Sequence, residues 1–467
     1  MISFYFLSCF LIFYVNVPYA NTTCKNKKNS SYSEKKERKF TNFATQTRFS
    51  GKEKQNMNHT QSIAIIGAGA AGCFCAINLK RFLPELDIDI FEASDTALRK
   101  LAMTGGGRCN LTNTFVEVEK LFKVYPRGDK LLNRAFSKFD SGDTMQWFED
   151  AGISLYSQED NRVFPTSDNA MEVVEMLLHK INILGIHLHL AHKVTTIGFD
   201  NGKYSLVFQT QGQKSKQYDK IVVTTGSFTS DGTGNMLKAF DLKIVPPCGS
   251  LFSFSIDSEW CEKLMGASVE NVSLRLAGTR FKTNGSILFT HWGVSGPAVL
   301  KLSSVAARYL FEKSYKATLL VNWFNEYSED DIRQVLQEFI AEHPQKQVTN
   351  IYPDIFSQKQ WTYFLEKAKI PFSQRWNALT STHINRLIAR LSNDEYTIKG
   401  KAHYKKEFVT CGGVALCNVN YDTLESTKQK GLYFAGEVLD IDALTGGFNL
   451  QAAWSTAYCV AKAIASE

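Results

Sequence analysis

A glycine-rich turn between an apolar run and a helix-compatible segment constrains this fold more than any other feature of the sequence. Residues 63–66 are Ile, Ala, Ile and Ile, residues 67–72 read GAGAAG, and residues 73–82 continue as an apolar segment that fits a helix. Strand, glycine turn and helix in this order are typical of the first unit of a dinucleotide-binding fold. The motif by itself does not distinguish FAD from NAD.

Each glycine of this turn has its own predicted role. Gly67 permits the tight turn, Gly69 lets the backbone approach a pyrophosphate, and Gly72 lets the helix pack closely on the strand. A second predicted strand, residues 88–91, ends in Glu92, which lies 20 residues after Gly72. A carboxylate at this place accepts hydrogen bonds from a ribose 2′-OH and repels a 2′-phosphate.

Two further glycine clusters favour FAD. Residues 104–113 read TGGGRCNLTN, in which one arginine and two asparagines can donate hydrogen bonds to phosphate or flavin oxygens. Residues 431–440 form a short apolar strand that leads into a glycine and two carboxylates, and residues 445–451, TGGFNLQ, open a helix that runs to Ala465. The positive end of that helix can face the electron-rich edge of a reduced isoalloxazine.

Together these motifs resemble those of the HI0933-like flavoproteins, a branch of the glutathione-reductase-like FAD superfamily. The family includes proteins named as aminoacetone oxidases and BaiN-like steroid or flavin reductases. The resemblance spans roughly residues 60–467, and it also includes LFTHWGVSGPAVL at 288–300 and FAGEVLDIDALTGGFNLQAAWSTAY at 434–458. One departure is Ser227, where members of the family often have a second glycine.

The resemblance implies roles for individual residues. Residues 67–72 would hold the pyrophosphate, Glu92 the adenosine ribose, and Asp440 or Glu437 the ribityl chain. Gly446, Gly447 and Asn449 would line the isoalloxazine, Val194 would contact adenine through its backbone, and residues 221–226 would close over the nucleotide. The complete predicted cofactor set is Gly67, Ala68, Gly69, Ala70, Ala71, Gly72, Glu92, Ala93, Lys100, Gly105, Gly106, Gly107, Arg108, Cys109, Asn110, Val194, Thr225, Gly226, Gly436, Glu437, Asp440, Gly446, Gly447, Asn449 and Leu450.

The predicted fold is α/β: a discontinuous glutathione-reductase-like FAD-binding Rossmann domain with an inserted β-barrel-like domain and a nested helical subdomain. It is discontinuous because the C-terminal motifs complete a site that begins near residue 63. Short alternating segments at 251–256 and 317–322 indicate the barrel-like insert. Ser328, Ser357, Thr380 and Ser381 are candidate N-caps of three helices. By resemblance, these helices form a lid over the flavin face.

The predicted segments follow from these patterns. They are 60–246 and 409–467 for the FAD-binding domain, 247–327 for the β-rich insert, 328–395 for the helical subdomain, and 396–408 for the return of the insert. Residues 1–59 are predicted to be a leader or a disordered extension. For this region a translation start near Met57 is favoured over a secretory or organelle leader and over a membrane anchor.

The net charge of +7 lies entirely before this fold. Residues 22–59 hold ten Lys or Arg against three acidic residues, and residues 60–467 sum to zero. A neutral body has no global attraction for a phosphate backbone, so no nucleic-acid partner is expected. We also expect a cytoplasmic protein without stable membrane association.

Candidate catalytic groups are few. The sequence contains no HExxH, GxxxxGK or GxSxG motif and no CxxC pair, so neither a metal site nor dithiol chemistry of the thioredoxin-reductase type is predicted. His291 can act as an acid or base, but a hydrogen-bonded histidine at a domain junction is the favoured interpretation. Cys109, beside Arg108, can have a lowered pKa, but a packing role is favoured.

These features predict an FAD-dependent oxidoreductase that acts on a small organic or alicyclic substrate. Electrons would pass between the substrate, the flavin and either NAD(P)H or O2. The alternative is a flavin-dependent RNA-modifying protein, and a third hypothesis is an interaction module that holds FAD structurally. The insert carries no motif that identifies the substrate.

Overall fold

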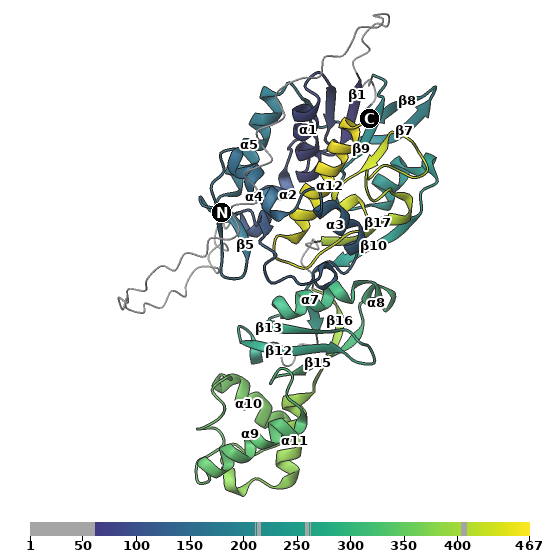
Figure 1. The fold of residues 1–467 in the computed structure, drawn as a ribbon. Coiled ribbons are helices and arrows are strands. Elements are labelled where there is room, and N and C mark those ends of the chain that lie inside the picture. Colours follow the sequence, from purple (N-terminus) through teal and green to yellow (C-terminus); the bar gives the residue numbers. More distant parts are fainter. Residues whose placement is uncertain (1–60, 211, 213–215, 257–260, 262, 403–408) are drawn as a thin grey trace, which may run out of the picture. The chain divides into compact units, whose positions relative to one another are not determined.

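The computed structural model describes residues 61–210, 212, 216–256, 261, 263–402 and 409–467 (Figure 1). The predicted leader at 1–59 and residues 403–408 of the predicted return at 396–408 lie outside the described residues. Among the helices that are described, none has the length and apolar character to span a bilayer.

A five-stranded parallel sheet with the order β18–β9–β1–β2–β6 forms the centre of the cofactor fold. Every residue of β1, β9 and β18 is buried, as expected for parallel strands that are covered on both faces. The predicted Rossmann-type α/β class is therefore confirmed. The strands are β1 (Ser62–Ile66), β2 (Asp87–Phe91), β6 (His187–His189), β9 (Lys220–Val223) and β18 (Leu432–Phe434).

Helices α1 (Ala70–Phe82) and α12 (Phe448–Ala465) lie side by side and pack on each other (Figure 1). The ring of Phe74 on α1 lies 5.1 Å from the ring of Trp454 on α12, and both side chains are fully buried. Aromatic pairs of this kind bury a large apolar area. The C-terminal helix thus shares one core with the first strand and helix of the fold.

Further helices and strands of the cofactor fold lie between β2 and residue 208 in the chain. Three short strands form one small antiparallel sheet, and β7 pairs with β8 in another. The helices are α2 (Arg99–Ala102), α3 (Asp129–Phe136), α4 (Ser141–Asp150) and α5 (Ala170–Ile183), and the strands are β3 (Thr112–Asn113), β4 (Leu155–Ser157), β5 (Arg162–Pro165), β7 (Val194–Asp200) and β8 (Lys203–Phe208).

Six further strands close into a barrel in the order β11–β14–β13–β12–β15–β16. The barrel has a hydrophobic core of its own, and α7 (Pro297–Val305) and α8 (Ala307–Glu312) follow β14. The strand predicted at 251–256 begins only at Phe254, because Leu251 has a φ of 56° that interrupts the extended backbone. The barrel strands are β11 (Phe254–Ile256), β12 (Ser268–Leu276), β13 (Lys282–Thr290), β14 (Gly293–Ser295), β15 (Ala317–Asn322) and β16 (Asp394–Lys401).

Three helices lie between β15 and β16: α9 (Glu329–Glu342), α10 (Gln358–Lys367) and α11 (Ser381–Ser392). Each begins with a capping box, at Ser328, Ser357 and Thr380. Ser381 is not a cap as predicted but the first residue of α11, because the Thr380 hydroxyl already accepts the hydrogen bond from the N–H of His383.

The chain passes from the cofactor fold to the barrel through β10 (Ile244–Ser250) and returns through β17 (Val409–Val414). These two strands pair in an antiparallel ladder with an irregularity between Val245 and Cys248. The predicted boundary after residue 246 therefore lies inside β10, and the predicted resumption at residue 409 coincides with the first residue of β17.

Candidate cofactor site

The loop at residues 67–72 joins β1 to α1 and shows three distinct steric environments. Gly67 has a φ of +111°, and a Cβ atom added there would lie 2.4 Å from the carbonyl oxygen of Thr224. A Cβ at Gly72 would lie 2.0 Å from the carbonyl oxygen of Gly67, whereas one at Gly69 would meet no atom within 4 Å. Two glycines thus permit close packing, and the third leaves its backbone accessible.

The first turn of α1 leaves its N–H groups without a side-chain partner. Gly69 is the N-cap, no side chain caps the helix, and its first turn has no acidic residue. The first N–H groups of a helix lack intrahelical partners and carry partial positive charge. This end of α1 therefore has the donor geometry that a pyrophosphate requires.

Glu92 follows β2 and is bound to the same loop. Its carboxylate accepts hydrogen bonds from the N–H of Ala68 and from the N–H and hydroxyl of Ser94, each at 2.9 Å. The backbone carbonyl of Glu92 accepts from the N–H of His192 at 2.8 Å, two residues before Val194, the first residue of β7. The predicted ribose acid and the predicted adenine segment are therefore neighbours. Ala93 is exposed beside them.

The second glycine cluster forms an exposed turn. Gly105, Gly106 and Gly107 all have positive φ, and a Cβ at Gly106 or Gly107 would meet no atom within 4 Å. Arg108 is held beneath this turn, with its guanidinium 4.4 Å from the ring centroid of Phe164.

Cys109 follows in the same segment and is fully buried. Burial raises the pKa of the Cys109 thiol to about 12. This shift is opposite to the lowered pKa that a redox thiol would need, so the packing role remains the better interpretation.

The second and third glycine clusters meet in space. The side-chain amide of Asn113 donates to the carbonyl of Gly446 at 3.1 Å, across 333 positions of sequence. A Cβ at Gly447 would lie 2.2 Å from the carbonyl oxygen of Thr112, and 2.9 Å from the side-chain amide of Asn110. Gly447 is also the N-cap of α12, which, like α1, has no side-chain cap and no acidic residue in its first turn.

The first and third clusters are also in contact. A Cβ added at Gly436 would lie 3.0 Å from the Cβ of Ala71 at the start of α1. Ala70, beside it, is half-buried. All three clusters therefore converge around the starts of α1 and α12, at the carboxyl ends of β1 and β18, where ligands of parallel α/β folds bind.

The two predicted ribityl carboxylates have different surroundings. Glu437 accepts hydrogen bonds from Ser227 at 2.8 Å and from the exposed Lys100 at 3.2 Å, and it lies 3.8 Å from a Cβ built at Gly226. Asp440 pairs with Arg308 of α8 at 2.6 Å and accepts from the N–H of Gly412 at 3.1 Å. Of the two, Glu437 is the one beside the predicted nucleotide segment at 221–226. In that segment, the hydroxyl of Thr225 forms a hydrogen bond with the hydroxyl of Thr233.

Asn449 has a local role in this region. Its side chain accepts from the N–H of Ala443 at 3.0 Å and donates to the carbonyl of Ala443 at 3.1 Å, so it fixes the loop that precedes α12. Leu450 is half-buried in the first turn of the helix and packs against the core.

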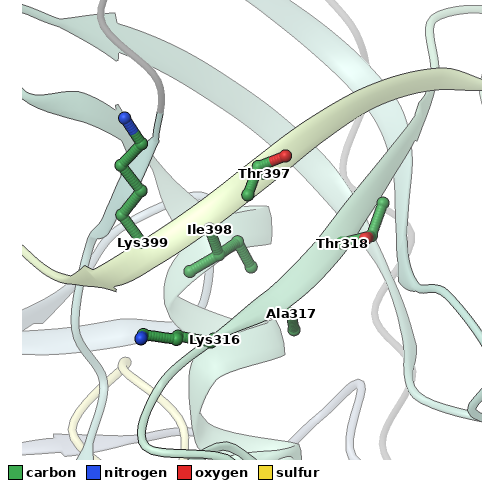
Figure 2. A pocket seen from close by; sticks show the side chains of 6 residues that line it. All are labelled: Lys316, Ala317, Thr318, Thr397, Ile398 and Lys399. Carbon is green, nitrogen blue, oxygen red and sulfur yellow. The ribbon is translucent and has the colours of Figure 1, made fainter.

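His291 belongs to a different part of the chain. It is exposed in the turn between β13 and β14, and its ring lies edge-on to Trp292 at 4.2 Å. A pocket on the barrel, drawn in Figure 2, is lined by residues of β15 and β16 with Lys316 beside them. This pocket contains none of the predicted site residues.

Sequence reasoning missed five residues in this region. Arg308 binds Asp440, Arg127 forms an ion pair with the buried Asp442, and Cys248 lies opposite Cys411. The partners are between 132 and 315 positions apart in the sequence, so no local spacing indicates them.

The geometry fits FAD. A long dinucleotide needs accessible glycine backbone, uncapped helix starts and a ribose acid along one edge of the sheet, and the described residues provide all three. These features define the chain as a dinucleotide-binding protein of the Rossmann type.

Comparison with known proteins identifies the family. The model of the HI0933-like protein Rossmann domain matches residues 61–463, and the chain belongs to this family. The chain is 28% identical over 412 residues to a ribosomal RNA dihydrouridine synthase of Haemophilus influenzae, covering 86% of this chain and 98% of the relative. It is 28% identical over 407 residues to an Escherichia coli protein of the same name, covering 85% and 96%.

A third relative has a different name. The chain is 26% identical over 411 residues to a 3-dehydro-bile acid delta(4,6)-reductase of Clostridium scindens, covering 86% of this chain and 98% of the relative. Among solved structures, a 3-ketosteroid delta1-dehydrogenase from Sterolibacterium denitrificans matches with a TM-score of 0.44 and 11% identity, covering 87% of this chain and all of that one. The match to the family model confirms the predicted resemblance to the HI0933-like family.

Proposed function

We propose that the protein is a reductase that adds two hydrogens to a carbon–carbon double bond conjugated to a carbonyl group, with NAD(P)H as the electron donor. The proposal is supported by the type of reaction that the names of the relatives have in common. A delta(4,6)-reductase of a 3-dehydro-bile acid and a dihydrouridine synthase both saturate such a bond. FAD, when bound, supplies hydride transfer between the nicotinamide and the substrate.

The chain's own residues provide binding and orientation. The loop at 67–72 and the start of α1 hold the phosphates, and Glu92 is fixed by Ala68 and Ser94 in the place of the ribose acid. The start of α12 supplies positive potential opposite the second glycine cluster. Glu437, held by Ser227 and Lys100, is the carboxylate for the ribityl hydroxyls.

The first substrate candidate is a small cyclic enone. The bile-acid relative supports it, and so does the zero net charge of residues 60–467, which provides no global attraction for a polyanion. In this case the substrate would be recognised mainly by apolar contact and by a few donors to its carbonyl oxygen.

The second candidate is a uridine in ribosomal RNA. Two relatives carry that activity in their names, and the charge of this chain is unevenly divided. Residues 251–408 hold twenty Lys or Arg against sixteen Asp or Glu, so the insert is positive and the remainder of residues 60–467 is equally negative. A positive insert can bind the phosphate backbone of RNA.

One anaerobic experiment tests the reaction and separates the substrates. The FAD-loaded protein is reduced with NADH or NADPH, and we expect loss of the flavin absorbance at about 450 nm. Addition of a cyclic enone or of unmodified ribosomal RNA should restore the absorbance and yield a product two hydrogens heavier, detected by mass spectrometry. Reoxidation by O2 but by neither acceptor would contradict a reductase and favour an oxidase.

A further inference from the structure

We propose that Cys248 and Cys411 form a reversible dithiol–disulfide pair on the two strands that join the cofactor fold to the barrel. This inference does not depend on the proposed substrate. It concerns residues that are 163 positions apart and belong to no CxxC motif.

The geometry of β10 and β17 places the two cysteines for bond formation. Cys248 and Cys411 are direct partners in the antiparallel ladder, and their sulfur atoms lie 3.2 Å apart. Directly opposed residues of such a ladder have Cα atoms about 4.5–5.5 Å apart. Disulfides span Cα separations of about 4.4–6.8 Å, so the bond can form without separating the strands.

The charges around the pair give the two sulfurs different roles. The hydrogen bond between the two sulfurs, together with the nearby positive charges of Arg127 and Arg308, lowers the pKa of Cys248, although burial and Asp442 act in the opposite direction. The pKa of the Cys411 thiol is raised by the same hydrogen bond and by burial. On the positive charges of Arg127 and Arg308 beside Cys248, we assign Cys248 as the nucleophile and Cys411 as the resolving thiol.

Hydrogen peroxide is the oxidant that we assign to the reaction, because it is small enough to reach a buried sulfur. The Cys248 thiolate attacks one peroxide oxygen, the O–O bond breaks, and hydroxide leaves a sulfenic acid on Cys248. The sulfur of Cys411 then attacks the sulfur of Cys248, the S–O bond breaks, and the departing hydroxide takes the thiol proton as water. Two thiols lose two electrons and two protons, and one peroxide becomes two waters.

The pair is linked to the cofactor site through the backbone of β17. The N–H of Thr410 donates to Glu437 at 3.2 Å, and the N–H of Gly412 donates to Asp440 at 3.1 Å, on either side of Cys411. A disulfide would bring the sulfurs from 3.2 Å to about 2.05 Å and draw β17 toward β10. We therefore expect the disulfide to alter the binding of FAD.

The test uses the full-length, FAD-loaded protein. Samples treated with hydrogen peroxide or with dithiothreitol are denatured, alkylated with N-ethylmaleimide, digested without reduction and analysed by mass spectrometry. We expect a peptide linked through Cys248 and Cys411 after peroxide and its loss after dithiothreitol. Oxidation of the exposed Cys417 shows that peroxide has reacted with the protein. If Cys248 and Cys411 are each alkylated separately in such a sample, the proposed pairing is wrong.

Variants assign the two roles. In Cys411→Ser, peroxide should leave a sulfenic acid on Cys248 that dimedone traps, whereas Cys248→Ser should give no adduct at position 411. Cys417→Ser is the matched control and should form the linked peptide like the wild type. A dimedone adduct at position 411 would reverse the two roles. The comparison of peroxide-treated and dithiothreitol-treated wild-type protein decides whether the disulfide forms, even where a variant fails to fold.

Equal FAD affinity of oxidised and reduced wild-type protein would refute the link to the cofactor site.

Discussion

Gly69 and Gly72 lie three residues apart in one loop, yet substitution of each should affect a different property. At Gly72 the backbone of Gly67 occupies the space that a side chain would need. At Gly69 the φ of −85° is open to any residue, and no protein atom lies within 4 Å of an added Cβ. Gly72 therefore governs folding, and Gly69 governs the approach of a ligand.

Gly69→Ala should fold normally and bind FAD weakly, because the methyl group would separate the backbone from the pyrophosphate. We expect a melting temperature of the FAD-free protein within about 2 °C of the wild type. The FAD dissociation constant should rise at least about tenfold, a loss of about 1.4 kcal/mol in a flavin fluorescence titration.

Gly72→Ala is the matched comparison, with the same added methyl group. It should lower the melting temperature of the FAD-free protein, because the Cβ would lie 2.0 Å from a carbonyl oxygen that belongs to the backbone. If Gly69→Ala binds FAD with the affinity of the wild type, the assignment of the 67–72 loop to the cofactor site is wrong.

At the scale of elements, one carboxylate ties β2 to its neighbours. Asp89 on β2 is bonded to the ring Nε2 of His189 on β6 at 2.7 Å and accepts from the hydroxyl of Tyr218 at 2.9 Å. Burial by itself raises the pKa of the Asp89 carboxyl, but hydrogen bonds from His189, Lys216 and Tyr218 outweigh burial and lower that pKa.

Asp89→Asn should therefore destabilise the protein in a pH-dependent way. A carboxyl whose pKa is lower in the folded protein contributes stability above its unfolded pKa of about 3.9, and loses it as the pH falls through the folded pKa. We expect the variant to lose about 1–3 kcal/mol of unfolding free energy at pH 7. Urea unfolding at a series of pH values should show the two proteins converging below about pH 4, and a constant difference would contradict the argument.

At the scale of the whole molecule, one ion pair connects three regions of the chain. Arg127 binds Asp442, which is fully buried, and also donates to the carbonyl of Ser304 in α7 at 3.0 Å. Asp442 in turn accepts from Ser250 of β10 at 2.8 Å. The cofactor fold, the connecting ladder and the barrel thus share one buried charge.

Arg127→Met should cost about 3–5 kcal/mol of unfolding free energy, because it leaves Asp442 charged and buried without a cation. The matched control is Arg134→Met, whose partner Asp422 is exposed, and it should cost at most about 1 kcal/mol. Both values come from urea unfolding followed by circular dichroism. The double variant Arg127→Met with Asp442→Asn should recover part of the loss, and a further loss would show that the buried charge is not the cause.

Much of the cofactor fold could be predicted because its signals are local. The turn at 67–72, the acid Glu92 and the glycine start of α12 are each indicated by a few consecutive residues, and Gly67 and Gly447 have positive φ values that favour glycine. Helix caps such as Ser328 are local for the same reason. Glu437 and Asp440 were not separable, because their difference depends on Arg308 in a distant helix.

The sequence alone thus determined the class of fold and the family, since each glycine cluster lies within one short stretch of chain. Only the tertiary structure decided which groups meet across the ladder of β10 and β17. Cys248 faces Cys411, and Arg127 reaches Asp442, because strand pairing and core packing bring together residues that no periodicity relates. Contacts of that kind are fixed by the register of the whole fold and leave no pattern in the chain.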